Sequence, residues 1–245
     1  MPEARPAADR VLVALDVESL DAATSMLDRL AGVVTGCKIG TQLFTAAGPA
    51  AVEAARKRGF RVFLDLKFHD IPNTVAGAVR EATRLGVFML NVHAGGGLAM
   101  MRAAAEAAAR TAVEIGAARP LCVGVTVLTS LDRRALDVEL GVPASVEGHV
   151  LHLARLAREA GLDGCVASPR EIVPLRVNLG RSWVIVTPGI RPGAPGEGPA
   201  ADDQVRIATP RAALAAGADY LVVGRPITAA PDPAAAAREI LAELG

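Results

Sequence analysis

Residues 63–74 read FLDLKFHDIPNT and join a predicted strand to a predicted helix. The apolar run from Val62 to Leu64 is typical of a buried strand, and Asp65 and Lys67 come directly after it. Because side chains alternate between the two faces of a strand, these two point the same way, roughly 7 Å apart along the backbone. Pro72 suits the first turn of a helix, where its missing N–H is not needed. The stretch therefore predicts charged side chains on a strand-to-helix connection, where parallel α/β proteins carry their active sites.

Three charged side chains of this stretch, Asp65, Lys67 and Asp70, point to catalysis by an ammonium group. Charges at a buried strand end are costly unless they are paired. Between two carboxylates, Lys67 is expected to remain an ammonium at neutral pH, which makes it a poor Schiff-base nucleophile. An ammonium is suited to stabilising negative charge on carbon and to delivering a proton there. A structural ion-pair network is the alternative.

The alternation of strand and helix runs along the whole chain. Near-continuous β-branched runs predict eight strands, at 11–17, 34–39, 61–66, 87–92, 121–128, 164–167, 183–187 and 219–223. Helical patterns lie between them, as at 20–30, 49–58, 74–85 and 98–115. Strands of this kind suit a parallel sheet covered by helices on both faces. We therefore expect one α/β domain over residues 1–245, a single (β/α)8 TIM barrel with a flexible N-terminus at residues 1–9. A doubly wound open sheet is the alternative.

Length and composition exclude several classes of protein. The chain has 245 residues, of which 51% are hydrophobic, enough for a large core. With 26 basic and 26 acidic residues its formal net charge is zero, which argues against binding to nucleic acid or to a membrane surface. No apolar stretch has the length of a membrane span, and the first ten residues lack the apolar core of a secretory signal. Three widely spaced cysteines in apolar runs, Cys37, Cys122 and Cys165, are typical of buried thiols in a reducing cytoplasm.

Motifs for cofactors are missing from the sequence. There is no G-x-G-x-x-G or Walker-type loop to support a nucleotide cofactor. His149 and His152 share one face of a predicted helix, but further ligands at a suitable spacing are lacking. We therefore expect neither a cofactor nor a metal site.

Polar residues recur where the predicted strands end. They are Asp16, Lys38, Asp65, Lys67, His93, Thr129, Ser130, Gly224 and Arg225. In a barrel the carboxyl ends of all strands share one rim, so these residues are expected to converge on one pocket. Each also has a structural alternative; Asp16, for example, is placed to cap the helix that begins near Ser19. It is the recurrence from strand to strand that favours a site.

Two features near the end of the chain suggest a phosphate group. Gly224 and Arg225 follow the last strand, where glycine lets backbone N–H groups approach an anion and a guanidinium favours phosphate. The Gly-, Pro- and Ala-rich loop from Gly189 to Gln204 follows the seventh strand and offers Arg191 beside them. Its length and composition suit a lid that closes over a ligand, and an ordinary surface insertion is the alternative.

Together these residues resemble the orotidine 5′-phosphate decarboxylase family. The strongest part of the resemblance is the D-x-K-x-x-D segment at residues 65–70, continued by Ile-Pro-Asn-Thr at 71–74. Supporting blocks occur in the expected order: Cys-Lys-Ile-Gly at 37–40, Asn-Val-His-Ala at 91–94, Val-Leu-Thr-Ser at 127–130, Thr-Pro-Gly-Ile-Arg at 187–191 and Val-Gly-Arg at 223–225. Such a series over nearly the whole chain is far more specific than any one motif.

The resemblance implies decarboxylation of orotidine 5′-phosphate to UMP and CO₂ without a cofactor, the final step of de novo pyrimidine nucleotide biosynthesis. In that mechanism Lys67 stabilises and then protonates a carbanion at C6 of the pyrimidine, and Asp65 lies near the departing carboxylate. The resemblance also implies that Lys38 and Asp16 bind the ribose hydroxyls and that Thr129 and Ser130 contact the pyrimidine. Gln204, Gly224 and Arg225 would bind the phosphate, and Pro188 and Arg191 would bind the substrate on or beside the closing loop.

The resemblance also implies a homodimer with shared active sites. In the family Asp70, Ile71 and Thr74 reach into the pocket of the neighbouring subunit, so Asp70 joins Lys38, Asp65 and Lys67 as a catalytic residue.

Two rival functions stay open. Decarboxylases of 3-keto-L-gulonate 6-phosphate resemble this barrel and share the D-x-K-x-x-D segment, but use Mg²⁺ held partly by a carboxylate at the end of the second strand. Here that place carries Lys38, whose charge would repel the metal. A catalytically silent phosphate-binding barrel is the other rival, and it leaves the charges at residues 65–70 without a purpose.

Overall fold

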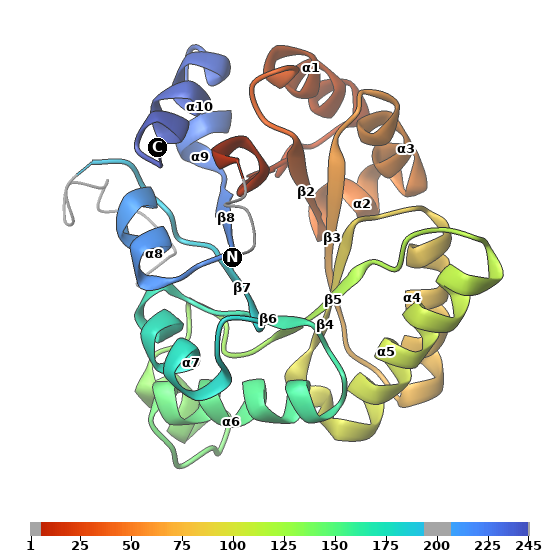
Figure 1. The fold of residues 1–245 in the computed structure, drawn as a ribbon, viewed down its shortest axis with the longest axis vertical. Coiled ribbons are helices and arrows are strands. Elements are labelled where there is room, and N and C mark those ends of the chain that lie inside the picture. The colour runs from red at the N-terminus through yellow and green to blue at the C-terminus, as the bar shows by residue number, and fades with distance from the viewer. Residues whose placement is uncertain (1–5, 194–206, 245) are drawn as a thin grey trace.

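The computed structural model describes residues 6–193 and 207–244, which form a closed barrel of eight parallel strands (Figure 1). The strands are β1 Val11–Ala14, β2 Gly36–Gly40, β3 Arg61–Phe68, β4 Met89–His93, β5 Leu121–Val125, β6 Gly164–Val166, β7 Val184–Thr187 and β8 Tyr220–Val223. Each strand pairs with the next in sequence, and β8 pairs with β1 at Val11–Leu221, which closes the ring. The predicted (β/α)8 barrel is confirmed, and the open-sheet alternative is wrong.

Helices surround the barrel and connect its strands (Figure 1). They are α1 Leu20–Leu30, α2 Thr41–Ala47, α3 Pro49–Lys57, α4 Pro72–Arg84, α5 Gly97–Glu114, α6 Val146–Glu159, α7 Ile172–Leu179, α8 Pro210–Ala216, α9 Arg225–Thr228 and α10 Pro233–Ala242. Local signals set their starts: the Ser19 hydroxyl accepts a hydrogen bond from the Ala22 N–H, and Pro72 occupies the first turn of α4. Ser19, not Asp16, therefore caps α1. None of the helices in the described part of the chain is long and apolar enough to cross a membrane.

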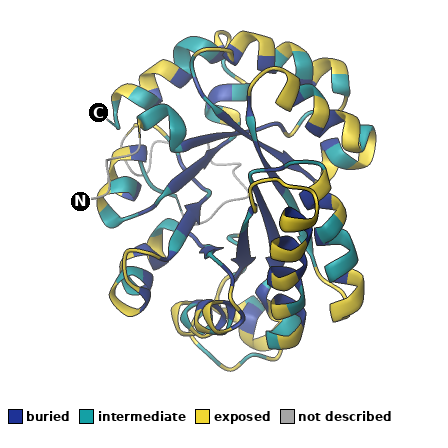
Figure 2. Ribbon diagram, turned by 45° about the vertical axis from the view of Figure 1, so that its right-hand side comes forward, coloured by how far each residue is buried: buried dark blue, intermediate teal, exposed yellow. Residues whose placement is uncertain are grey.

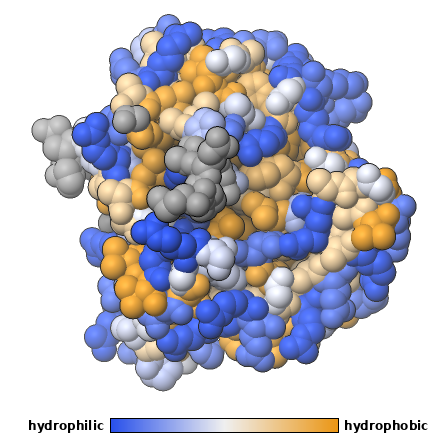
Figure 3. All heavy atoms as spheres, viewed as in Figure 1, coloured by the Kyte–Doolittle hydropathy of each residue, from blue (hydrophilic) through white to orange (hydrophobic). Residues whose placement is uncertain are grey.

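The core has two layers, separated by the sheet. Strand residues that point inward fill the barrel, among them Leu12, Phe63, Met89, Val186 and Tyr220. Alternate residues point outward and pack against the helices, which turn their exposed faces to solvent (Figure 2). On the face seen in Figure 3, hydrophilic side chains cover most of the outer ring, and hydrophobic ones are visible towards the middle.

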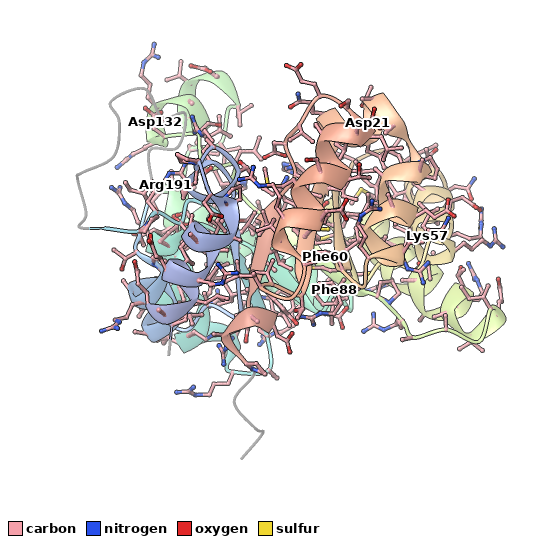
Figure 4. All side chains as sticks on the ribbon, turned by 90° about the horizontal axis from the view of Figure 1, so that it is seen from above. Asp21, Lys57, Phe60, Phe88, Asp132 and Arg191 are labelled. Carbon is pink, nitrogen blue, oxygen red and sulfur yellow. The ribbon has the colours of Figure 1, made fainter. Side chains whose placement is uncertain are left out.

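The two ends of the barrel lie opposite each other in Figure 4. Asp21, Asp132 and Arg191, which follow strands, lie towards the upper end of that view, whereas Phe60 and Phe88, which precede strands, lie lower. We call these the carboxyl end and the amino end of the barrel.

Several expected boundaries differ from the observed ones. The first and fifth strands end at Ala14 and Val125, three residues before the expected ends at residues 17 and 128. Of the segment at residues 1–9, which we expected to be flexible, residues 1–5 lie outside the described residues, and the flexibility stays a prediction. Ala7–Asp9 form one turn of 3₁₀ helix, and the Asp9 carboxylate accepts a hydrogen bond from Thr35 Oγ1 at 2.6 Å. We also expected the third strand to end at residue 66, whereas β3 continues to Phe68. It does so because its pairing with β4 shifts register between Leu64 and Phe68, which a sequence pattern does not reveal.

Candidate active site

A cavity of about 480 Å³ opens at the carboxyl end of the barrel. The predicted site residues that line it are Asp16, Lys38, Asp65, Lys67, Thr129, Pro188, Arg191, Gly224 and Arg225. Apolar side chains such as Phe63, Val125 and Val222 form other parts of its wall. Residues that lie up to 209 positions apart in the sequence, from Asp16 to Arg225, therefore converge on one hollow, as the recurrence of polar strand ends predicted.

Four charged side chains of alternating sign form a row along the cavity wall. Lys38 Nζ lies 3.0 Å from Asp16 Oδ1 and 3.4 Å from Asp65 Oδ2. Lys67 Nζ lies 2.7 Å from Asp65 Oδ1. The side chains of Lys38 and Asp65 are only 9% and 13% exposed, so each charge is kept in a poorly hydrated place by an opposite charge at contact distance. The row gives the cavity an ammonium, Lys67, supported by a carboxylate.

The backbone of Lys67 is strained. Its φ of 51° lies in the left-handed region. Among residues 6–193 and 207–244, Lys67 is the sole non-glycine residue with a positive φ. A side chain in that region costs about 1–3 kcal/mol, and such strain gathers at functional sites. It occurs inside the irregular pairing of β3 with β4, where Leu64 pairs with Leu90 but Phe68 pairs with Val92. The bulge aims the Lys67 side chain into the cavity.

Asn91 on β4 is a site residue that the sequence analysis did not single out. It is completely buried. Its Nδ2 donates a hydrogen bond to Asp65 Oδ1 at 2.7 Å, and its Oδ1 accepts one from the Lys67 N–H at 2.8 Å. The signal that was available is a polar side chain within the apolar run Met89–Val92, where a buried amide needs partners.

Gly40 is the second residue missed, and it makes room for the charged row. A Cβ atom at Gly40 would lie 2.9 Å from Lys38 Nζ and 3.2 Å from Asp16 Oδ1. The first distance is shorter than Cβ atoms tolerate and the second is tight, so a side chain at Gly40 would displace the ends of Lys38 and Asp16 from their present positions. The sequence analysis quoted the block Cys-Lys-Ile-Gly at residues 37–40, but it gave no physical reason for the glycine.

Within one chain Lys67 pairs with Asp65, whereas Asp70, the second expected carboxylate, lies away from the cavity. Asp70 is exposed, and its Oδ1 accepts a hydrogen bond from the N–H of Ile71 at 2.6 Å. Of the described residues that line the cavity, none is Asp70, Ile71 or Thr74. The reason is that the chain turns outward after Phe68 towards α4, and it leaves Ile71 67% exposed. Ser130 is likewise exposed and outside the described lining, whereas its neighbour Thr129 belongs to it.

The segments after β7 and β8 continue the cavity wall beyond Asp16, because β8 pairs with β1 in the closed barrel. Pro188, Gly189 and Arg191 line it from one segment, and Gly224 and Arg225 from the other. The helix α9 that begins at Arg225 has a single turn of four residues, so little helix dipole is available there and the guanidinium groups supply the positive charge.

The predicted lid loop is fixed at its base. The Arg191 N–H donates to the Ala208 carbonyl at 3.0 Å, and the Ala208 N–H donates to the Gly189 carbonyl at 3.1 Å. Gln204, the other residue that we expected to contact a phosphate group, lies outside the described residues. The closing motion of the loop stays a prediction.

A pair of stacked imidazoles borders the site. The rings of His69 and His93 lie 5.2 Å apart at an interplanar angle of 16°, and His93 Nδ1 accepts a hydrogen bond from the Gly95 N–H. Burial, aided by His69 and Lys67, lowers the pKa of His93 below its ordinary value of 6.5. His93 is therefore neutral at neutral pH, and the positive charge of this region resides on the lysines.

Other reactive groups contribute no chemistry to the cavity. Burial raises the pKa of Cys37, Cys122 and Cys165 to about 12, so these thiols remain protonated and inert. Among residues 6–193 and 207–244, no three His, Cys, Asp or Glu side chains come together in a way that suits a metal ion. The described site therefore offers an ammonium–carboxylate pair on one side and guanidinium groups on the other, which suits a small anionic substrate that develops negative charge near Lys67.

Comparisons with known proteins agree with this geometry. The family model described as orotidine 5′-phosphate decarboxylase / HUMPS family matches residues 9–240. Over 238 residues the chain is 57% identical to a protein of Moorella thermoacetica named orotidine 5′-phosphate decarboxylase, covering 97% of this chain and 93% of that protein. It is 51% identical over 235 residues to the protein of that name from Nitrosococcus oceani, covering 96% and 97% of the two chains.

Solved structures give the same result. The crystal structure of orotidine 5′-phosphate decarboxylase from Lactobacillus acidophilus superimposes with a TM-score of 0.85 at 35% identity, covering 99% of this chain and 100% of that one. An uncharacterized conserved protein from Geobacillus kaustophilus superimposes with a TM-score of 0.83 at 38% identity, covering 96% and 100%. The chain therefore belongs to the orotidine 5′-phosphate decarboxylase / HUMPS family.

Proposed function

We propose that this protein is an enzyme, a carboxy-lyase that converts orotidine 5′-phosphate to UMP and CO₂ in the final step of de novo pyrimidine nucleotide biosynthesis. The observation that carries the proposal is the pair of Lys67 and Asp65, 2.7 Å apart, facing a cavity of about 480 Å³ with guanidinium groups across it. A nucleotide with a carboxylate on its base matches this division of charge.

The reaction needs a proton and a place for an electron pair. As the bond from C6 to the carboxylate breaks, CO₂ leaves and the electron pair remains on C6. The Lys67 ammonium stabilises this pair through its charge and then transfers a proton to C6, which gives UMP and a neutral amine. Solvent returns the proton to the amine. The residues at hand can perform each step, so the proposed reaction uses no cofactor.

The remaining residues of the row position the substrate. Asp65 lies between Lys38 and Lys67, so its carboxylate holds both ammonium groups in place. Asp16 and Lys38 lie farther along the wall and are proposed to bind the ribose hydroxyls, with Thr129 and Ser130 on the pyrimidine. On the other side Arg191, Gly224 and Arg225, with Gln204, are proposed to bind the phosphate. Binding energy from that remote group can then assist the chemistry at C6.

We also propose that the enzyme is a homodimer with shared sites, located in the cytoplasm. Asp70, Ile71 and Thr74 do not line the cavity of their own chain, and Ile71 exposes 67% of its surface beside the charged Asp70. A second copy would cover Ile71 and would bring Asp70 close to the partner's lysine. The cytoplasmic location rests on the three buried, unpaired cysteines, which suit a reducing compartment.

The direct test is an absorbance assay with orotidine 5′-phosphate and purified protein, in buffer with and without EDTA. Rapid loss of substrate with formation of UMP, unchanged by EDTA, is the expected result. Turnover abolished by EDTA would favour a metal-dependent member of the family. Tight UMP binding without turnover would favour a silent phosphate-binding barrel.

Subunit mixing tests the shared site. Lys67→Ala and Asp70→Ala proteins are each expected to be inactive. Mixed dimers contain one site with both residues intact, so up to half of the activity per site should return in them. Asp137→Ala, which removes an exposed carboxylate on the segment Ala135–Glu139, should by contrast be active without mixing. Confirmed mixed dimers without activity would contradict shared sites.

A further inference from the structure

Asn91 holds an unusual position for an amide side chain. It lies in the middle of β4 and is 0% exposed, at a point where the barrel interior is otherwise apolar below the charged row. Its strand neighbour on β5 is Val123. A buried amide is costly unless its donors and acceptor are used, so its bonds indicate its purpose.

Both ends of the Asn91 amide bind to the same short segment of β3. The NH₂ group donates to Asp65 Oδ1 at 2.7 Å, the oxygen atom that also lies 2.7 Å from Lys67 Nζ. The amide oxygen accepts from the backbone N–H of Lys67 at 2.8 Å. One side chain therefore contacts the counter-ion of the catalytic ammonium and the backbone that carries this ammonium.

The second bond replaces a missing strand partner. Leu64 pairs with Leu90 and Phe68 with Val92, so three residues of β3 stand opposite Asn91 alone. Within this bulge Lys67 has its φ of 51° and its N–H cannot continue the ladder. The Asn91 oxygen takes the place of the absent carbonyl and stabilises the strained conformation.

We infer that Asn91 is a positioning residue for the proposed decarboxylation: its amide fixes Asp65 and the Lys67 backbone relative to each other, so that the ammonium is held at the reacting carbon. The inference rests on the proposed function. A neutral amide is suited to this task because it donates to one group and accepts from the other without adding charge to the row of Asp16, Lys38, Asp65 and Lys67.

Asn91→Ala removes both bonds. Because misplacement of a catalytic group by about 1 Å costs about 100-fold in rate, kcat is expected to fall by about that factor. KM for orotidine 5′-phosphate and Kd for UMP should stay within about threefold, since the groups that bind ribose and phosphate are untouched. Thr126→Val is the matched control, because Thr126 is 1% exposed next to β5 and donates to the Val166 carbonyl at 2.9 Å without touching Asp65 or Lys67. Its kcat should be unchanged.

Asn91→Asp separates positioning from folding, because the introduced carboxyl imitates the amide only when protonated. Protonated, it donates to Asp65 and accepts from the Lys67 N–H; ionised, it loses the donor and repels Asp65. The charged groups near position 91 are Asp65 and Lys67 on β3 and Lys38 on β2. His93 on β4 is a further titratable group, and β5 presents Val123. Burial and the Asp65 carboxylate raise the pKa of the introduced carboxyl, although the two lysines oppose the shift.

The kcat of Asn91→Asp, divided by that of the unchanged protein at each pH, is therefore expected to be highest at about pH 5.5 and to fall at least about tenfold by about pH 9. A ratio independent of pH would overturn the inference, also where Asn91→Ala does not fold. Unchanged kcat in Asn91→Ala, or equal losses of kcat and UMP affinity, would overturn it as well. If the unchanged protein itself does not turn over orotidine 5′-phosphate, it is the proposed function that fails.

Discussion

The two ends of the barrel use the same residue types for opposite purposes. At the amino end, Asp163 accepts hydrogen bonds from Arg119 and from the Cys122 N–H, and Asp219 accepts them from Arg176 and from the Ile185 N–H. Each carboxylate there ties an arginine to the backbone at the start of a neighbouring strand. At the carboxyl end, the charged row Asp16, Lys38, Asp65 and Lys67 bonds largely to itself and faces a cavity.

The difference lies in what the charges are bonded to. A carboxylate that accepts a hydrogen bond from a strand N–H satisfies a backbone donor and so stabilises the barrel. Its removal is expected to lower the free energy of unfolding. An ammonium that faces a cavity lowers the stability of the folded chain, as does the positive φ of Lys67. Its removal is expected to lower the rate of the reaction. We therefore expect substitutions at the carboxyl end to change rate, and substitutions at the amino end to change stability.

Lys67 is expected to give the largest effect. Lys67→Ala removes both the charge and the proton donor, so kcat should fall by at least about 10⁴-fold in the absorbance assay. Lys67→Gly should be equally inactive. Because glycine accepts a φ of 51° without strain, it should nevertheless be more stable than Lys67→Ala by about 1 kcal/mol in urea unfolding.

The comparison of these two variants separates strain from chemistry. Equal stabilities would show that the bulge relaxes when the lysine is absent. Turnover in either variant above about a thousandth of the normal rate would contradict the role of the ammonium.

Arg176 is expected to give the largest effect on stability. Its Nε donates to the Gly217 carbonyl at 2.7 Å and its Nη1 to the Gly180 carbonyl at 3.0 Å, beside its ion pair with Asp219. Arg176→Met removes the donor to both carbonyls and leaves Asp219 without its counter-ion, so the free energy of unfolding should fall by about 3 kcal/mol. The kcat of the folded protein should stay within about twofold of normal, because no catalytic group has moved.

Arg102, an exposed arginine on α5, provides the control. Arg102→Met should change the free energy of unfolding by less than about 0.5 kcal/mol. A loss of kcat in Arg176→Met comparable to that of a cavity residue would contradict the division of labour between the two ends.

The sequence was sufficient for the fold because each strand–helix unit carries its own local signals. The run Val62–Leu64, the proline at residue 72 and the alternation of apolar strands with amphipathic helices do not depend on distant contacts. The recurrence of polar residues at strand ends then placed Asp16, Lys38, Asp65 and Lys67 on one rim, as observed.

What the sequence did not reveal depends on pairing between strands. The shift between β3 and β4 lengthens β3, places Lys67 at positive φ and gives Asn91 its two bonds. None of these follows from hydrophobic periodicity, because a bulge is a property of two strands. The outward direction of Asp70 likewise depends on how the chain leaves the bulge, and its proposed role needs a second subunit.

Gly40 at the carboxyl end and Gly164 at the amino end are both tightly surrounded, by different kinds of atom. A Cβ at Gly40 would meet the Lys38 ammonium and the Asp16 carboxylate, which are the ends of flexible side chains. Gly40→Ala is therefore expected to displace that ion pair and to lower kcat/KM roughly tenfold, with little change in stability. A Cβ at Gly164 would lie 2.2 Å from the Val184 carbonyl oxygen, which belongs to the backbone. Gly164→Ala should instead cost about 1–3 kcal/mol of stability with kcat unchanged.

Steady-state kinetics and urea unfolding of both alanine variants test these two expectations. A loss of stability in Gly40→Ala as large as in Gly164→Ala would mean that the charged row contributes to the fold, contrary to the expectation above.

The pH dependence of stability gives the smallest expected effect. Burial, with His69 and Lys67, lowers the pKa of His93 below 6.5, so the unfolded chain binds more protons than the folded chain just below that pH. The contribution of His93 to stability is therefore fully present above about pH 6.5 and is lost as the pH falls towards its lower folded pKa.

His93→Asn isolates this contribution. Asparagine can still accept the hydrogen bond from the Gly95 N–H, as the imidazole does at 3.2 Å, but it does not titrate. The free energy of unfolding of the unchanged protein should fall more between pH 7 and pH 5.5 than that of His93→Asn. Burial next to His152 also lowers the pKa of His149 on α6, so a smaller decline with the same sign should persist in the variant and disappear in His93→Asn/His149→Gln. Identical pH profiles for all three proteins would contradict this prediction, because they would mean that protonation of His93 and His149 does not change the free energy of unfolding.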